Sequence, residues 1–362
     1  MTQVYVSKGL FPRSYFEETV SYIARVQEPD GGIPWFPGGT LDPWDHVEAA
    51  MGLSLGGRVE AAEKAYSWLQ NNQRPDGSWL AAYQRGQVVD GTRAETNFVA
   101  YVATGVWHHY QITRNQAFLR ETWEMVFRAM TFVLNLQTSH GEIYWALDTR
   151  TGINRDALIT GCSSIFKSLE CMANIAHTLG EDPEPWLEAR EKLGQAILTR
   201  PDRFDRTWES KERFSMDWFY PVLAGVMQGE VAEQRLQQRW STFVVPELGC
   251  RCVSDESWVT IAETCELTMA CIGAGNSHQA VEVFSWLHEY RHSDGSWWTG
   301  YAFEDKVLWP DERPTWTAGA VLLAADALAQ HSPASYLFTQ ELLPDALQNT
   351  QSLRLGPFGK QS

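Results

Sequence analysis

The chain has 362 residues, of which 44% are hydrophobic and 20% are charged, so its composition is typical of a folded globular protein and excludes a disordered one. The formal net charge of −16 would repel phosphate backbones, which excludes nucleic acids as partners. No stretch approaches the roughly 20 apolar residues of a membrane helix, and the N-terminus lacks the apolar run of a signal peptide. These features predict a cytoplasmic location.

Two kinds of helix alternate along the chain. Amphipathic patterns, which have one polar face for the solvent, predict outer helices near residues 14–27, 58–73, 116–137, 184–199, 230–243 and 278–291. Patterns that are apolar nearly all round predict buried helices at 47–55, 95–110, 163–179, 216–227, 263–272 and 315–328. This alternation predicts an all-α fold, an (α/α)6 toroid with two concentric rings around a central apolar cavity.

The toroid is expected to form one domain, residues 1–331, with a C-terminal tail over residues 332–362 that packs on the barrel or extends from it. Asp42 and Pro43 provide an N-cap and a first-turn proline for one buried helix. Glu95 and Glu263 stand three residues after a threonine, which predicts capping boxes at two others. Because the buried helices of such a barrel run in one direction, their N-termini should gather at one mouth of the cavity.

A short turn motif recurs after the amphipathic helices. The copies are Gln27-Glu-Pro-Asp-Gly31, Gln73-Arg-Pro-Asp-Gly77-Ser-Trp79, Gln137-Thr-Ser-His-Gly141 and Arg291-His-Ser-Asp-Gly295-Ser-Trp297. They resemble the QW motifs of the squalene-hopene cyclase superfamily, and a chain with length for one barrel resembles its monodomain class II terpene cyclases. The resemblance implies an isomerase that protonates a polyprenyl or prenylated aromatic substrate and cyclises it through carbocations, without a metal or other cofactor.

The Asp-x-Asp-Asp acid motif of class II cyclases is absent. Its nearest counterpart is Asp42-Pro-Trp-Asp45-His46, where two carboxyl groups three residues apart could share one proton. Asp45 is the expected general acid, and His46 could orient Asp42. The alternative for both carboxyl groups is stabilisation of the helix N-terminus. Asp217 and Glu266 are further catalytic candidates.

Carbocations also need aromatic faces, and a substrate carboxylate would need an arginine near the mouth. Arg93 or Arg313 could hold such a carboxylate. The aromatic residues at or near the starts of the buried helices are the expected lining of the cavity, with ordinary core packing as the alternative for each: Trp44, Phe98, Tyr101, Trp218, Tyr220, Trp258, Trp309 and Trp316.

Other functions fit the same barrel. A carbohydrate-active (α/α)6 enzyme would also use paired carboxylates and tryptophan platforms. A non-catalytic barrel that binds a lipid or isoprenoid would fit the missing acid motif. An open groove with exposed tryptophan favours a glycan, whereas a closed apolar pocket favours a terpene. The sequence leaves open the oligomeric state and peripheral contact with a membrane, where hydrophobic substrates are found.

Overall fold

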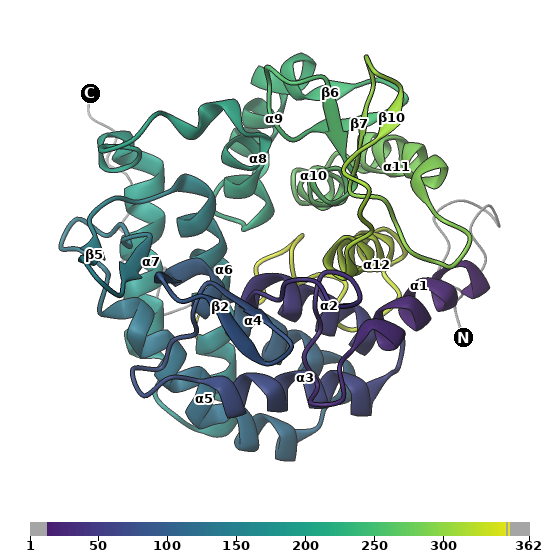
Figure 1. Cartoon of the computed structure of the whole chain (residues 1–362). Helices are drawn as coiled ribbons and strands as arrows, with labels where there is room; N and C mark the ends of the chain where they lie inside the picture. Colours follow the sequence, from purple (N-terminus) through teal and green to yellow (C-terminus); the bar gives the residue numbers. More distant parts are fainter. Residues whose placement is uncertain (1–12, 345–346, 348–362) are drawn as a thin grey trace, which may run out of the picture.

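A computed structural model describes residues 13–344 and residue 347, so the chain ends, including most of the predicted tail beyond residue 344, lie outside the described residues. Within them the helices form two concentric rings (Figure 1). The inner ring consists of α2 (Pro43–Leu55), α4 (Thr96–Thr113), α6 (Ile159–Leu179), α8 (Ser215–Leu223), α10 (Ile261–Gly273) and α12 (Thr315–Ala329). Each inner helix packs on the next, and α12 packs on α2 to close the ring. The predicted (α/α)6 toroid is confirmed.

The outer ring covers the inner one, and each outer helix packs on the inner helix that follows or precedes it in the chain. Its members are α1 (Arg13–Val26), α3 (Val59–Asn72), α5 (Gln116–Leu134), α7 (Glu184–Thr199), α9 (Gly229–Phe243) and α11 (Ser277–Ser285), which a 3-10 turn (Trp286–Tyr290) extends. The apolar stripe of each outer helix faces inward, because that is the only way to remove it from water.

The recurring turns fasten neighbouring outer helices to one another. In the second copy, the Gln73 side-chain amide donates to the carbonyl oxygens of Gly77, at 2.9 Å, and of Met125 on α5, at 2.8 Å. Gln27 and Gln137 make the same pair of bonds, each to its own glycine and to the next outer helix. The motif therefore serves the packing of the ring and carries no information about the chemistry in its centre.

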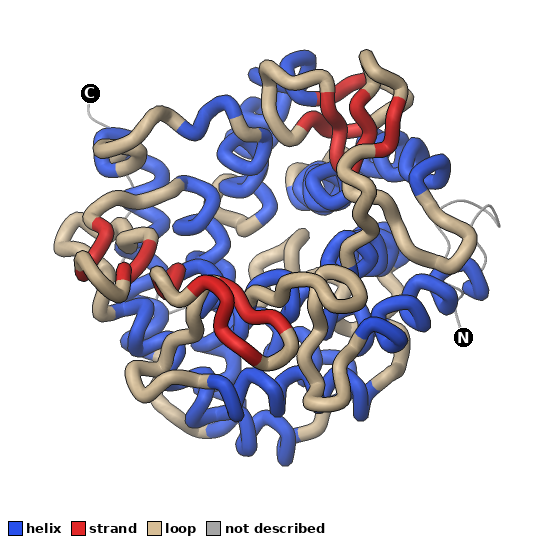
Figure 2. Tube along the Cα trace, in the orientation of Figure 1, coloured by secondary structure: helices blue, strands red, loops and turns tan. Residues whose placement is uncertain are grey.

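Short strands lie at the end of the barrel where the inner helices begin. One sheet has the order β10-β9-β8-β7-β6 and a second the order β3-β4-β5, while β1 and β2 form a hairpin. Strand β3 runs directly into α4, and β8 runs directly into α10, so these strands surround the mouth (Figure 2). Their bounds are Ala82–Gln84, Gln87–Asp90, Arg93–Glu95, Ala146–Asp148, Gly152–Asn154, Val244–Val245, Gly249–Arg251, Trp258–Thr260, Gly300–Ala302 and Val307–Leu308 for β1 to β10.

The strands correct one detail of the sequence analysis. Glu95 is the N-cap residue of α4 itself, and Thr260 that of α10, and neither threonine-glutamate pair forms a capping box. The N-cap role of Asp42 at α2 is confirmed, because its side chain accepts from the backbone N–H of Asp45. None of the described helices is both long and apolar enough to cross a membrane.

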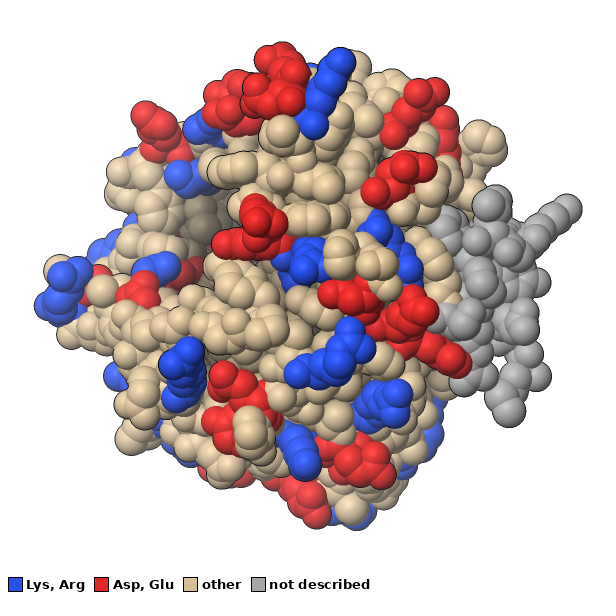
Figure 3. All heavy atoms as spheres, turned by 45° about the vertical axis from the view of Figure 1, so that its right-hand side comes forward, with Lys and Arg blue, Asp and Glu red and all other residues tan. Residues whose placement is uncertain are grey.

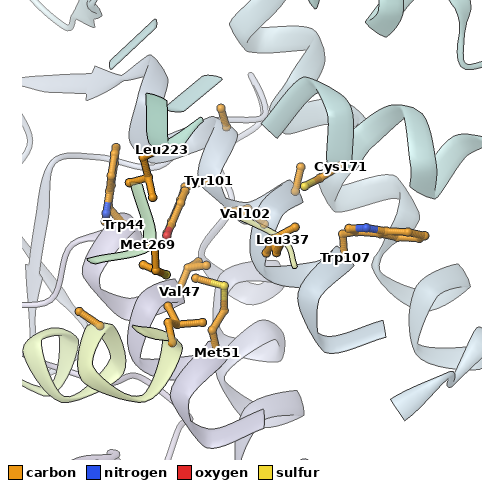
Figure 4. Close-up of a cluster of buried hydrophobic side chains, with 14 of the residues drawn as sticks. Trp44, Val47, Met51, Tyr101, Val102, Trp107, Cys171, Leu223, Met269 and Leu337 are labelled. Carbon is orange, nitrogen blue, oxygen red and sulfur yellow. The ribbon is translucent and has the colours of Figure 1, made fainter. Parts of the chain in front are cut away.

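The middle of the barrel is a packed core below the mouth. Val47 and Met51 of α2, Val102 of α4 and Met269 of α10 lie among its buried side chains (Figure 4). Leu337, from the segment after α12, is 1% exposed and joins this cluster from the far end. The chain after the last inner helix therefore closes the end of the barrel opposite the mouth, which leaves a blind pocket.

Candidate active site

A pocket of about 320 Å³ opens at the mouth of the inner ring. It lies where the first turns of the inner helices converge, and four of its lining residues are carboxylic acids. The lining consists of Trp44, Asp45, Glu48, Asn97, Phe98, Thr160, Met216, Ala262, Glu263, Glu266, Trp316 and Ala320. The pocket thus combines aromatic walls with ionisable groups.

The carboxyl groups form two pairs with the same spacing on two helices. Asp45 and Glu48 belong to α2, and Glu263 and Glu266 belong to α10. Residues three apart on a helix share a face, so each pair projects into the pocket, with one member in the first turn and the other a turn deeper. Helix α12 packs on both α2 and α10 and separates them. The two pairs therefore approach the pocket from different walls.

The surroundings of Asp45 favour the protonated form of its carboxyl group. Its carboxyl group is hydrogen-bonded to that of Asp42, which also accepts from the Trp35 indole N–H at 2.9 Å. Asp45 keeps some exposure to the pocket while protein surrounds its other sides. Burial, and then the neighbouring Asp42 carboxylate, raise the pKa of Asp45 well above its usual range. A carboxyl group in this state is a proton donor near neutral pH.

A tyrosine hydroxyl holds the deeper member of each pair. Tyr101 donates to Glu48 Oε2 at 2.5 Å, and Tyr220 donates to Glu266 Oε1 at 2.5 Å. Burial raises the pKa of Glu48 to about 7, although the hydrogen bond from Tyr101 lowers it in part. Burial also raises the pKa of Glu266 well above its usual range. These two groups are fixed in position, which suits a role in holding a substrate.

Glu263 differs from the other three. It stands in the first turn of α10, where the helix dipole favours a negative charge. Among the described residues its Oε2 atom is buried without a hydrogen-bond partner. Such a carboxylate can take a proton or attack a carbon atom.

Several polar atoms of the pocket lining are buried and lack a partner among the described residues. They are Asn97 Oδ1, Glu263 Oε2, Glu266 Oε2 and the Trp316 indole Nε1. A buried polar group without a partner costs about 1–3 kcal/mol, so a ligand that carries its own donors and acceptors would be favoured here. A hydrocarbon would leave all four atoms unsatisfied, whereas a sugar could bond to them.

The aromatic wall is an ordered stack. The Trp44 ring lies on Tyr101, with centroids 4.7 Å apart and planes 15° from parallel. Phe98 meets the Trp44 ring edge-on at 6.1 Å. Trp44 is 9% exposed, so the stack presents only part of its surface to the pocket. A flat apolar face beside carboxyl groups matches the mixed polarity of a sugar ring.

Comparison with known proteins distinguishes between a terpene cyclase and a carbohydrate-active enzyme. No protein-family profile matches the sequence. The MMP endo-(1,4)-3-O-methyl-alpha-D-mannosidase of Mycolicibacterium hassiacum is 45% identical over 340 residues, which are 94% of this chain and 93% of that protein. The chain belongs to the family of this mannosidase. It therefore belongs to a family of enzymes.

Solved structures with a fold similar to that of this chain are distant from it in sequence. A glycosidase in complex with glucose has a TM-score of 0.68 at 14% identity, over 87% of this chain and 96% of its own. A D-mannose isomerase has a TM-score of 0.68 at 10% identity, over 90% of this chain and 98% of its own. At this identity the two structures support the toroid and nothing finer.

Membership of the mannosidase family shows that the resemblance to terpene cyclases was misleading. The prediction of an isomerase that cyclises a polyprenyl or prenylated aromatic substrate through carbocations is wrong, since the relative is a glycosidase. The error has a physical source, because the Gln-Gly turns that carried the resemblance fasten outer helices together. Any (α/α)6 barrel needs such contacts. The carbohydrate-active alternative agrees with the family.

The structure brings part of the predicted site together. Asp45, Glu266, Trp44, Phe98 and Trp316 line the pocket, and Tyr101 and Tyr220 hold its deeper carboxyl groups. Asp42 supports Asp45 from behind. Glu48, Asn97, Thr160 and Met216 were not among the candidates, and Glu263 was interpreted as a capping residue. The repeated spacing of two acids, Asp45-x-x-Glu48 and Glu263-x-x-Glu266, is the sequence signal that would have found Glu48 and Glu263.

Three predicted residues face away from the pocket. The ring of His46 is fully buried between the Ile33 N–H, which donates to it at 3.0 Å, and the Ala65 carbonyl, at 2.9 Å, and burial lowers its pKa to about 4. Asp217 is outside the pocket lining, Arg235 of α9 donates to its backbone carbonyl at 3.1 Å, and burial raises the pKa of its carboxyl group to about 6. Trp218 is stacked on the Phe243 ring in the core between α8 and α9.

The remaining predicted residues lie in the strands and loops around the mouth. Arg93 is paired with Asp90 at 2.9 Å and with Glu95 at 2.8 Å, so its charge is already balanced. Arg313 donates to Asp294 and Ser296 in the fourth turn motif. Trp258 and Trp309 contact each other outside the pocket, on the five-stranded sheet.

Proposed function

We propose that this protein is a glycoside hydrolase that cleaves internal α-(1,4) bonds in a polymer of 3-O-methylmannose, the activity named for its relative. The proposal rests on one observation above all. Two carboxyl pairs from different inner helices enter one open pocket, and four buried polar atoms of its lining lack partners among the described residues. A pair of carboxyl groups on either side of the bond is the usual requirement for hydrolysis of a glycoside.

In this proposal Asp45 is the general acid. Its proton goes to the glycosidic oxygen as the bond between that oxygen and the anomeric carbon breaks. The hydrogen bond between Asp45 and Asp42 supports this role, because two adjacent carboxyl groups keep one proton at neutral pH. After the reaction Asp45 is an anion beside Asp42, and it recovers its proton from solvent through the mouth.

Glu263 acts as the general base. It takes a proton from a water molecule whose oxygen bonds to the anomeric carbon on the face opposite the leaving group. Helix α12 separates α2 from α10, and neighbouring helix axes lie about 8–10 Å apart. This separation leaves room for the water that an inverting enzyme places between its carboxyl groups. Glu48 and Glu266, held by their tyrosines, would bind hydroxyl groups of the sugar.

The experiment compares wild type with Asp45→Asn and Glu263→Gln on α-(1,4)-linked 3-O-methylmannose oligosaccharides. We expect both variants to lose at least about a hundredfold in kcat, in line with general acid–base catalysis. Asp217→Asn is the matched control, because Asp217 is a buried carboxyl group with a raised pKa outside the pocket, and we expect it to keep most of the activity. Hydrolysis that survives both pocket variants would disprove the assignment.

The stereochemistry of the first product provides an independent test. Proton NMR during the reaction distinguishes a β-anomer, expected for attack by water, from an α-anomer. Formation of the α-anomer would assign Glu263 as a nucleophile instead of a base. If the wild type binds the oligosaccharides and cleaves none of them, the protein is a glycan-binding barrel and the hydrolase proposal is wrong.

A further inference from the structure

A second hollow lies on the five-stranded sheet at the rim of the mouth, outside the pocket. It has a volume of about 650 Å³, and its walls combine two tryptophans with four acids. Figure 3 shows acidic side chains gathered near the upper edge of the face turned forward. We call this surface the Trp309 platform, formed by Trp258, Val307 and Trp309 with Asp255, Glu256, Glu304 and Asp305.

The aromatic part of the platform is held in place. The Trp258 indole N–H donates to the Trp309 carbonyl at 2.9 Å, and the two rings meet edge-on with centroids 5.2 Å apart. Trp258 lies against Gly300, where a Cβ atom would come within 2.3 Å of the indole nitrogen. The absence of a side chain at Gly300 therefore makes the space in which the Trp258 ring rests.

Exposure of this platform requires an explanation. Trp309 is 54% exposed and Val307 is 47% exposed, and both line the hollow. Leu308 between them is 38% exposed and does not line it. Large apolar side chains in a row at the surface usually mark a binding site. Trp258 is held in place, and the Trp309 ring is open to solvent. A ligand could therefore bind to this surface without a rearrangement of the protein.

The chemistry of the platform selects the ligand. Asp255 is paired with Arg213 at 2.9 Å. The carboxyl groups of Glu256, Glu304 and Asp305 still give the rim of the aromatic face a negative charge that repels phosphates, sulfates and uronic acids, and they accept hydrogen bonds from hydroxyl groups. An aromatic face contacts the apolar side of a sugar ring, and the exposed Val307 side chain favours methyl groups over hydroxyl groups. A neutral, partly methylated sugar fits all of these features.

The platform is connected to the pocket by the chain itself. Trp258 opens β8, which leads without a break into α10 and its first-turn carboxylate Glu263. Three strand residues at about 3.3 Å each span about 10 Å, so the platform lies more than one sugar unit from the reacting bond. The far end of the barrel is closed, so a long chain must lie across the mouth and over its rim.

We infer that the Trp309 platform is a remote subsite that binds 3-O-methylated sugar units of the substrate chain, beyond the units in the pocket. This inference rests on the proposed function and deepens it. It places recognition of the methylated polymer partly on the rim, and it predicts that chain length and methylation are sensed away from the cleaved bond.

The test measures kcat and KM for wild type, Trp309→Ala and Trp309→Phe on short and long methylated oligosaccharides. A short substrate fills only the pocket, and a long one also reaches the rim. We expect Trp309→Ala to raise KM for the long substrate about three- to tenfold, the value of one aromatic contact, and to leave the short substrate unchanged. Trp309→Phe should restore most of the affinity. The same loss should be smaller for an unmethylated α-(1,4)-mannooligosaccharide of equal length.

Leu198→Ala is the matched control, because Leu198 is 50% exposed on outer helix α7. It should leave KM unchanged for every substrate. Equal KM values for wild type and Trp309→Ala on the long substrate would overturn the subsite while leaving hydrolysis intact. If no substrate is cleaved, binding of the long methylated oligosaccharide to wild type and Trp309→Ala, measured by calorimetry, decides the question. Weaker binding to the variant then supports the subsite, and equal binding overturns it.

Discussion

Glu48 shows how one buried side chain couples the site to pH. It is 6% exposed, and burial raises its pKa to about 7. The unfolded chain loses this proton near pH 4.5, whereas the folded protein keeps it until about pH 7. The folded state therefore binds more protons between these values, and the free energy of unfolding falls as pH rises through this window.

We predict that Glu48→Gln reduces this loss of stability. A neutral amide has no proton to release, so the variant should gain up to about 3 kcal/mol relative to wild type as pH rises from 4.5 to 7. Urea titrations of both proteins at pH 5 and pH 7.5 measure the difference. Parallel changes in the free energy of unfolding across this range would show that Glu48 does not carry the effect.

At the same scale, the sequence located some side chains and misplaced others. Asp45 and Glu266 follow from their positions at the starts of buried helices. His46 and Asp217 share that position along the chain, yet they point between helices, because neighbouring residues on a helix face directions about 100° apart. Which face meets the pocket depends on how the inner ring closes. That information lies in contacts between helices distant in the sequence.

At the scale of elements, the recurring turn is a packing device. Gly77 has a φ of +91°, and a Cβ atom there would lie 2.3 Å from the Arg128 carbonyl oxygen on α5. The turn thus needs glycine both for its backbone conformation and for contact with the next outer helix. The same close approach recurs at Gly31 and Gly141.

We predict that Gly77→Ala destabilises the protein more than Gly57→Ala. Gly57 has a φ of +70°, and no atom of the described residues lies within 4 Å of its hypothetical Cβ, so alanine there costs only the left-handed conformation, about 1–2 kcal/mol. At Gly77 the clash with α5 adds about 1–3 kcal/mol of overpacking. Urea denaturation of the two variants separates the two contributions. Equal losses of stability in the two variants would mean that α5 moves away from the added methyl group at little cost.

These turns also explain why the fold could be predicted from the sequence and the chemistry could not. Amphipathic and buried helices differ in their local pattern, so the alternation of the two rings is visible along the chain. The strands at the mouth are two to four residues long, too short for a period of two to stand out. A turn motif that only packs outer helices together can occur in any (α/α)6 barrel, whatever reaction that barrel catalyses at its mouth.

At the scale of the whole molecule, the far end of the barrel depends on a buried ionic network. Glu170 of α6 is fully buried and accepts from Lys167 Nζ at 2.9 Å, from Arg190 Nη2 at 2.9 Å and from the backbone N–H of Leu342 at 3.0 Å. Arg190 also pairs with Glu341 at 2.8 Å. Helices α6 and α7 are thereby joined to the segment that closes the barrel.

We predict that Glu170→Gln destabilises the protein by about 3–5 kcal/mol, because the buried Lys167 would lose the anion that balances it and Arg190 would keep only the partly exposed Glu341. Asp202→Asn is the control, since the Arg200–Asp202 pair is exposed and its loss should cost less than about 1 kcal/mol. Hydrogen exchange should also become faster in residues 331–343, which the network holds against the barrel. If Glu170→Gln matches Asp202→Asn in both stability and exchange, the network does not fasten the segment. If exchange alone accelerates, the network holds the closing segment without contributing to the stability of the two rings.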